Sequence, residues 1–208
     1  MKARAPRAAA PAPSPRVTAA RARPQVLRII GGRWKRSRLP VADRPQLRPT
    51  PDRVRETLFN WLGQDLAGWR CLDAFAGTGA LGFEAASRGA AQVLLLERDP
   101  ALANALRATA LRLQAEQVRV EVVDALAWMA RAAPASFDLV LLDPPYAAGL
   151  GAQALAAALP LVAAGGRLYF EAGSALAAAP PGWRILRRLR AGAVHAQLLA
   201  HAAAEEPG

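Results

Sequence analysis

Cysteine and histidine are scarce in this chain of 208 residues. The single cysteine, Cys71, excludes a disulfide framework and a zinc site built from cysteines, and it is most simply a small buried strand residue. The two histidines, His195 and His201, have no partner at a useful spacing and are too few for a histidine-rich metal centre. We therefore expect no metal ion.

Long apolar segments are also missing. The longest uncharged run, residues 144–166, could span a bilayer by its length, but its three prolines and four glycines argue against a transmembrane helix. Residues 1–24 lack the apolar core of a secretory signal, although an arginine-rich stretch without acids would also suit a transit peptide. We expect a monomeric cytoplasmic protein with no membrane partner.

Acidic side chains are lacking at one end of the chain. Residues 1–60 carry 15 basic and 3 acidic side chains, whereas residues 61–208 carry 12 and 13. Only two of the basic residues are lysines, which is typical of a GC-rich genome and says little about function. The position of the charge says more, because a basic segment ahead of a nearly neutral body suits a polyanionic partner such as RNA. For residues 1–24 a role in solubility is an equal alternative.

The front of the chain divides into a tail and a basic hairpin. Residues 1–24 are rich in alanine, proline and arginine, and we predict a disordered tail. Residues 25–49 are interpreted as a hairpin and linker, with strands at 26–30 and 33–39 joined by a glycine turn. Five basic residues and a tryptophan of this hairpin are predicted to bind RNA, the tryptophan by stacking unless it packs across the hairpin instead. They are Arg28, Arg33, Trp34, Lys35, Arg36 and Arg38.

The remainder, residues 50–202, is predicted to form an α/β domain, followed by a short tail at 203–208. Thr50 is expected to cap the first helix, with Pro51 in its first position. Short apolar runs then alternate with stretches of helical periodicity, a pattern typical of a parallel sheet covered on both faces. Residues 183–199 suggest an antiparallel hairpin at the sheet edge. The apolar runs are residues 71–75, 93–96, 118–123, 139–142 and 168–170.

The first strand of this domain leads into a glycine-rich turn. Gly77, Gly79 and Gly82 let the backbone turn tightly into a helix and approach a ligand, and they match the dinucleotide fingerprint G-x-G-x-x-G. Asp73 changes this interpretation, because its carboxylate would repel a pyrophosphate and attract a cationic amine or sulfonium. We therefore expect S-adenosylmethionine as the ligand, while helix capping by Asp73 is the plainer alternative.

Acids at two further strand ends suit the same ligand. Glu97 is placed to accept hydrogen bonds from the ribose diol, unless it is only a solvated charge at a strand end. Asp124 could receive the adenine amino group, or it could be an acid of a surface loop.

The fourth strand runs into Asp143-Pro144-Pro145-Tyr146. Two prolines remove two backbone donors, which leaves the carbonyls and the Asp143 carboxylate as acceptors beside an aromatic ring. This group suits an exocyclic amino group on a flat base: Asp143 and the Pro144 carbonyl would accept its two N–H bonds, and Tyr146 would stack on the ring. Asp143 could also take up the proton that leaves the nitrogen on alkylation.

The turn after Asp73, together with Asp143-Pro144-Pro145-Tyr146, resembles the S-adenosylmethionine-dependent amino methyltransferases of the class I, Rossmann-like fold. The segment Arg48–Leu62, preceded by the basic hairpin, is similar to the RsmD family, which methylates N2 of a guanine in bacterial 16S ribosomal RNA. The resemblance covers residues 26–200 and implies a seven-stranded sheet, a catalytic loop at Asp143–Tyr146 and 16S rRNA or the 30S subunit as partner. The cofactor-binding residues would be Asp73, Phe75, Ala76, Gly77, Gly79, Glu97, Asp124 and Ala125.

Other functions stay open from the residues alone. The same chemistry could act on adenine N6, on cytosine N4 or on a protein glutamine amide. The glycine fingerprint could serve an NAD-dependent oxidoreductase, which Asp73 disfavours, and the basic front end could belong to a non-catalytic RNA-binding protein. Asp143→Ala separates that last alternative from an enzyme, because a binder would keep its function. Arg48, Arg53 and Arg55 could face either RNA or the cofactor.

Overall fold

The structure, a computed structural model, describes residues 27–40, 50–145 and 149–202. The predicted tails at 1–24 and 203–208 lie outside the described residues, as do Arg48 and Tyr146. Within the described ranges, helices and strands alternate as the apolar pattern predicts.

Nine strands and five helices make up the described fold. The strands are β1 (Leu27–Arg28), β2 (Arg38–Leu39), β3 (Arg70–Asp73), β4 (Gln92–Glu97), β5 (Val118–Val122), β6 (Phe137–Leu142), β7 (Val162–Ala172), β8 (Trp183–Ala191) and β9 (Val194–His201). The helices are α1 (Asp52–Leu62), α2 (Ala80–Ser87), α3 (Pro100–Leu113), α4 (Ala125–Met129) and α5 (Gly151–Ala158), which continues into a short 3-10 turn, η2 (Leu159–Leu161).

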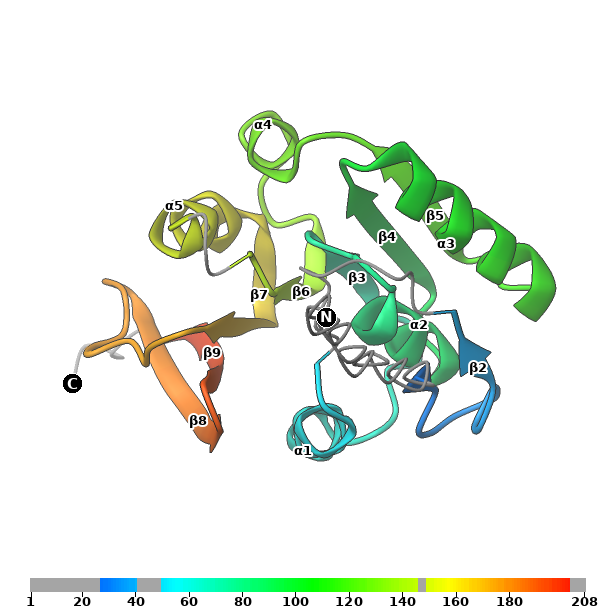
Figure 1. Ribbon diagram of the computed structural model, residues 1–208. Coiled ribbons are helices and arrows are strands. Elements are labelled where there is room, and N and C mark those ends of the chain that lie inside the picture. Colours follow the sequence, from blue (N-terminus) through cyan, green and yellow to red (C-terminus); the bar gives the residue numbers. More distant parts are fainter. Residues whose placement is uncertain (1–26, 41–49, 146–148, 203–208) are drawn as a thin grey trace, which may run out of the picture.

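Seven strands form one central sheet in the order β5-β4-β3-β6-β7-β9-β8, and β1 pairs with β2 in a small separate sheet (Figure 1). The strands from β5 to β7 in this order are parallel to their neighbours. β9 runs antiparallel to both β7 and β8. The predicted fold class, with its C-terminal antiparallel hairpin, is therefore confirmed.

The inner strands are apolar on both faces because helices cover both faces. In β6, Leu139 and Leu141 join a hydrophobic cluster with α1, α2 and α3, whereas Val140 and Leu142 join a second cluster with α4 and α5. All four side chains are fully buried. Figure 1 shows the two groups of helices on opposite sides of the sheet. In the described ranges no helix has the length and apolar character needed to cross a bilayer.

The N-terminal hairpin has shorter strands than predicted. The prediction of a strand over 33–39 is wrong except for its last two residues, which form β2. Residues 31–36 form a turn instead, in which Gly32 and Arg36 have a φ of 70°. The hairpin nevertheless contributes apolar side chains to the cluster beneath α1 and α2, so it packs directly on the main domain. These side chains are Leu27, Ile29, Trp34 and Leu39.

Helix α1 begins one residue later than predicted. Pro51 occupies the N-cap position, and no side chain caps the helix. Thr50, the expected cap, instead donates its hydroxyl to Asp143, with 3.4 Å between the two oxygens. Asp52 in the first turn pairs with Arg55 at 2.5 Å. The start of α1 therefore lies beside the end of β6, where the sequence places its candidate catalytic loop.

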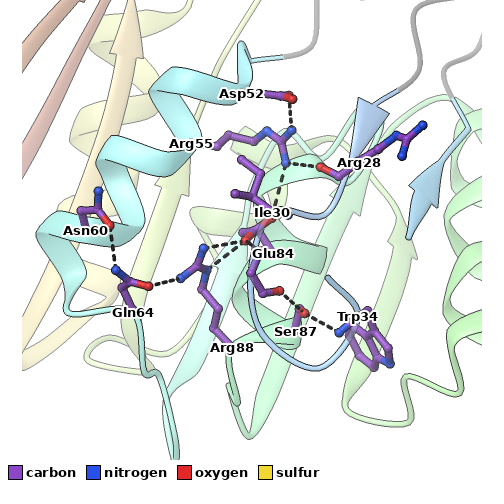
Figure 2. Close-up of polar contacts among 11 residues, drawn as sticks. Arg28, Ile30, Trp34, Asp52, Arg55, Asn60, Gln64, Glu84, Ser87 and Arg88 are labelled. Carbon is purple, nitrogen blue, oxygen red and sulfur yellow. Dashed lines mark hydrogen bonds and ion pairs between the residues drawn. The ribbon is translucent and has the colours of Figure 1, made fainter. Parts of the chain in front are cut away.

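A buried carboxylate on α2, that of Glu84, connects the hairpin to the main domain. Its two oxygens accept the backbone N–H groups of Ile30 and Gly31, each at 2.8 Å. Arg88 donates to the same carboxylate at 2.9 Å, and Arg55 lies 3.4 Å away (Figure 2). An unpaired carboxylate would be costly inside the protein. These partners are therefore what allows Glu84 to be fully buried.

The hairpin turn is bonded to the end of the same helix. The Ser87 hydroxyl donates to the Gly31 carbonyl at 2.6 Å and accepts the Trp34 N–H at 2.9 Å. The Ser87 carbonyl accepts the Arg33 N–H at 2.7 Å. At Gly32 a Cβ would lie 1.9 Å from that carbonyl, so only glycine fits the turn. The hairpin is thus fixed along its length and not only through its two short strands.

Removing the Glu84 carboxylate is expected to destabilise the fold. In Glu84→Ala two buried guanidinium groups and two hairpin amides lose a common acceptor, and breaking a buried ion pair costs about 3–5 kcal/mol. Urea unfolding measures the change in the free energy of unfolding. Glu116→Ala, which removes an exposed carboxylate, is the control and should change it by less than about 0.5 kcal/mol. Equal stability of the two variants would contradict this role for Glu84.

Candidate active site

Four acidic residues lie at the carboxyl ends of neighbouring strands. Asp73 ends β3, Glu97 ends β4, Asp143 follows β6 and Glu171 lies near the end of β7. Because these four strands are adjacent and parallel, the acids gather at one edge of the sheet. The strand order reverses between β3 and β6, and ligands of open α/β sheets bind beyond such a switch point.

The turn after β3 has the shape that its glycines predict. Gly77 and Gly79 have φ values of 52° and 74°, and the N-cap residue of α2, Gly79, has no side chain of its own to cap the helix. A Cβ at Gly79 would come within 2.6 Å of Leu106 and Phe83. The start of α2 thus presents backbone N–H groups at the edge of the sheet where the four acids gather, which we call the reaction edge. Within the turn Ala76 is buried and Phe75 half-buried.

Asp73 is buried beneath this turn, with 2% of its surface exposed. Its carboxylate accepts the N–H of Gly82 at 2.9 Å, so the capping contact is present. Gly82 permits this approach, since a Cβ there would lie 2.2 Å from Leu95. Burial raises the pKa of Asp73 to about 7, with a smaller upward effect from the charge of Glu97. A cationic ligand would restore the charged form of Asp73.

Glu97 and Asp124 both bind backbone amides. One oxygen of Glu97 accepts the Gly77 N–H at 3.0 Å and the other accepts the Asp99 N–H at 2.8 Å, which fixes this carboxylate against the glycine turn. Asp124 is exposed and caps α4 by accepting the Ala127 N–H at 2.9 Å. Each carboxylate keeps free acceptor positions, because two oxygens offer about four lone-pair sites. Their contacts with a cofactor, and that of the buried Ala125, stay predictions.

Asp143 is half-buried beside the switch point and accepts the Thr50 hydroxyl. The loss of hydration, followed by the negative charges of Glu171 and Asp73, raises the pKa of Asp143 well above its usual range. Of the two prolines that follow, the first is buried and the second exposed. The structure therefore brings Asp143 close to Asp73, while Tyr146 lies outside the described residues.

Glu171 is a candidate residue that sequence reasoning missed. Its side chain is 1% exposed and accepts the Tyr169 hydroxyl at 2.5 Å. The register between β6 and β7 places Glu171 next to Asp143, and its charge acts on both Asp143 and Asp73. The available signal was an acid directly after an apolar strand, the same signal that singled out Asp73.

Three carboxyl groups, those of Asp73, Asp143 and Glu171, therefore lie close enough to interact, and two of them, Asp73 and Glu171, are buried; we call this group of three side chains the recess. Mutual repulsion and burial both favour the protonated forms of Asp73 and Asp143 there. A ligand with a positive charge and no phosphate would relieve both effects. Within the described ranges no three or more His, Cys, Asp or Glu side chains are arranged to hold a metal ion.

The residues predicted to bind RNA fall into two groups. Five basic side chains are exposed, but Trp34 is only 8% exposed and belongs to the hydrophobic cluster that the hairpin shares with α1, α2 and α3. The Arg33 guanidinium lies 5.9 Å from the centre of its ring. Trp34 is therefore packed and not free to stack, but it packs in a cluster that the hairpin shares with the main domain and not across the hairpin alone. The exposed residues are Arg28, Arg33, Lys35, Arg36 and Arg38.

The hairpin turn lies away from the reaction edge. Its backbone is bonded to Ser87 at the end of α2, whereas the glycine turn precedes the start of that helix. A helix of eight residues rises about 12 Å over its length. Arg33 lines a polar pocket near the amino end of β5, together with Gln114, Glu116 and Gln117. The turn cations therefore lie about one helix length from the glycine turn.

Two of the three arginines left open between RNA and cofactor are described. Arg55 faces neither, because its fully buried guanidinium donates to the Arg28 carbonyl at 3.0 Å and pairs with Asp52 and Glu84. Arg53 is exposed on α1. Arg55 thus has a structural role. The sequence alone could not distinguish this role from contact with a ligand.

Known proteins match most of the chain. The family described as "Conserved hypothetical protein 95" matches residues 27–200. The chain belongs to this family. The resemblance to the RsmD family is confirmed as well, because curated relatives in it carry the name "Ribosomal RNA small subunit methyltransferase D".

Three individual matches show how much of this RsmD-family chain is shared with known proteins. The curated protein from Escherichia coli K12 is 48% identical over 124 residues, which are 60% of this chain and 62% of that protein. The one from Haemophilus influenzae is 44% identical over 132 residues, 62% of this chain and 68% of that protein. The solved structure of yhhF from Escherichia coli is 36% identical with a TM-score of 0.77, and the match covers 86% of this chain and 100% of that one.

Neutralising Glu171 is expected to lower the pKa of the Asp143 carboxyl. Glu171→Gln removes the negative charge and keeps the size of the side chain, while the larger effect of burial stays. A carbon-13 NMR titration of the Asp143 carboxyl measures the shift, with Glu116→Gln as a control at an exposed site. An unchanged pKa in Glu171→Gln would show that the two carboxyl groups do not interact.

Proposed function

We propose that this RsmD-family protein transfers a methyl group from S-adenosylmethionine to the exocyclic N2 of a guanine in 16S rRNA. The observation that carries the proposal is the position of Asp143-Pro144-Pro145, at the end of β6 and beside the glycine turn over Asp73. The names of the curated relatives support small-subunit rRNA as the substrate. By resemblance to the RsmD family, this guanine would be nucleotide 966.

The proposed cofactor suits the recess through its charge. S-adenosylmethionine carries an ammonium and a sulfonium group and no phosphate, so the Asp73 carboxylate would attract it where a dinucleotide would be repelled. Glu97, held by two backbone amides, keeps acceptor positions for the ribose hydroxyls. The exposed carboxylate of Asp124 would face the adenine amino group, with Phe75, Ala76 and Ala125 against the apolar parts.

Bound S-adenosylmethionine supplies an electrophilic methyl group on a positively charged sulfur. Asp143 and the Pro144 carbonyl would accept the two N–H bonds of guanine N2 and hold its lone pair in line with that methyl. Methyl transfer would form the N–C bond and break the S–C bond, with S-adenosylhomocysteine as the leaving group, and the nitrogen would lose a proton. The bound cation would favour the charged form of Asp143, which is then placed to accept this proton. Tyr146 would stack on the guanine ring.

Identification of the methylated nucleoside tests the proposal. The protein is incubated with labelled S-adenosylmethionine and undermethylated 30S particles, and the RNA is digested to nucleosides. We expect label in N2-methylguanosine. Asp143→Ala should lower kcat by at least about 100-fold, whereas Asp65→Ala, which changes an exposed turn acid, should leave kcat unchanged.

Three results would contradict the proposal in different ways. Label in N6-methyladenosine or N4-methylcytidine would overturn the choice of guanine. Unlabelled RNA, despite binding of S-adenosylmethionine, would overturn methyl transfer to 30S rRNA. Full activity of Asp143→Ala would overturn the assigned acceptor.

Binding of S-adenosylmethionine is expected to weaken below about pH 7. The pKa of Asp73 is raised to about 7, so a fall in pH through this value protonates the carboxyl and removes its attraction for the cation. Binding should therefore release protons near neutral pH. Titration calorimetry at several pH values between about 6 and 8 measures both effects. Asp73→Asn should bind more weakly throughout and lose this pH dependence; the same dependence in that variant would contradict the assignment to Asp73.

A further inference from the structure

Strand β8 carries positive charge that the proposed reaction does not use. Residues 172–202 contain four arginines, two histidines and no acidic residue. Residues 61–171, in contrast, carry 8 basic and 11 acidic side chains. The near-neutral body therefore contains a second basic segment at one edge of its sheet. The arginines are all exposed and all on β8: Arg184, Arg187, Arg188 and Arg190.

These guanidinium groups are not paired with acids in the part of the chain that the structure describes. The ion pairs found there lie elsewhere, near α1, α2 and β3. Arg187, Arg188 and Arg190 each donate to a backbone carbonyl, at distances of 2.9, 3.2 and 3.4 Å. A guanidinium has five N–H donors, so most of their hydrogen-bonding capacity is open to a partner.

The carboxyl end of β8 lies at the reaction edge of the sheet. Arg190 is in register with His195 of β9, and His195 is in register with Ala172 of β7, the residue after Glu171. Three spacings between neighbouring strands separate β8 from β6, a distance of roughly 14 Å. The end of β8 is therefore near enough to Asp143 to contact the RNA around a bound guanine.

The hairpin and β8 lie on opposite flanks of the reaction site. β8 is the outermost strand at one end of the sheet, and the hairpin packs on α2 at the other side of α1 (Figure 1). RNA with its target base at the recess would extend toward both flanks. The hairpin turn lies about one helix length from the glycine turn, so its cations are far from the reaction edge. The end of β8, in contrast, carries cations close to this edge.

We propose that Arg188 and Arg190, which share one face of β8 near its carboxyl end, form a second binding surface for the phosphodiester backbone of the rRNA, next to the target guanine. This inference rests on the proposed function and specifies how its substrate is held. Guanidinium groups bind phosphate oxygens in a bidentate way. Such contacts position the RNA and add salt-dependent affinity, without reading its sequence.

Charge on an edge strand has another known use, because it prevents strand pairing between molecules. If the β8 arginines served only that purpose, their loss would cause self-association and leave the RNA affinity of the monomer unchanged. RNA binding predicts the reverse: weaker and less salt-dependent binding by a protein that stays monomeric.

The test compares two double variants that remove the same charge. Arg188→Ala/Arg190→Ala changes one face of β8, and Arg119→Ala/Arg131→Ala changes exposed residues on β5 and just after α4. Binding to a 16S rRNA fragment is measured as a function of salt, and KM and kcat on undermethylated 30S particles. For the β8 variant we expect the slope of log K against log salt to fall by about 2. Its KM should rise, while kcat and affinity for S-adenosylmethionine stay unchanged.

Two results would contradict RNA binding by β8. One is an unchanged salt slope in the β8 variant. The other is an equal loss of RNA affinity in both double variants, which would attribute the effect to net charge. Arg188→Lys/Arg190→Lys keeps the charge and should retain most of the slope, and a full loss there would also contradict phosphate binding. Affinity for S-adenosylmethionine reports that each variant is folded. A wild-type protein that fails to methylate the particles would instead refute the proposed function, and the binding comparison would still decide on β8.

Discussion

A carboxylate can be buried only where donors surround it, and Glu84 meets this requirement with groups from three separate segments. Two hairpin amides, Arg55 of α1 and Arg88 after α2 all converge on it. Each of these groups would lose its acceptor if the carboxylate moved, so the hairpin, α1 and α2 are fixed relative to one another. Helix α2 also carries Gly82, whose amide binds Asp73. One short helix, α2, thus binds both the basic hairpin and Asp73.

The two aspartates of the recess differ from Glu84 because no cationic side chain among the described residues is paired with them. Glu84 faces two guanidinium groups, whereas Asp73 is met by backbone amides and Asp143 by a hydroxyl. Burial therefore raises the pKa of both aspartates, and the nearby Glu171 adds to the effect. Carboxyl groups kept in such an environment are typical of functional sites, where a ligand offsets the cost. A cationic methyl donor would do so here.

The fold and the edge that holds the site could be predicted from the sequence, because they depend on local patterns. Continuous apolar strands alternating with helices determine the sheet, and acids at strand ends locate the recess. What the sequence could not show depends on contacts between distant segments. Thr50 has the chemistry of a helix cap but donates to Asp143, and Arg55 has the appearance of a ligand contact but binds Glu84. Trp34, which could have stacked on RNA, is buried by the packing of the whole hairpin on α2.

Hydrogen exchange at the amides of Ile30 and Gly31 tests most directly whether Glu84 fixes the hairpin. Both lie just beyond a strand of two residues, where local structure alone gives little protection, and both donate to the buried carboxylate. We predict that these amides exchange as slowly as those of the central strand β6, only through global unfolding. Exchange at the rate of an exposed turn would show that the hairpin opens independently and would contradict the role of Glu84.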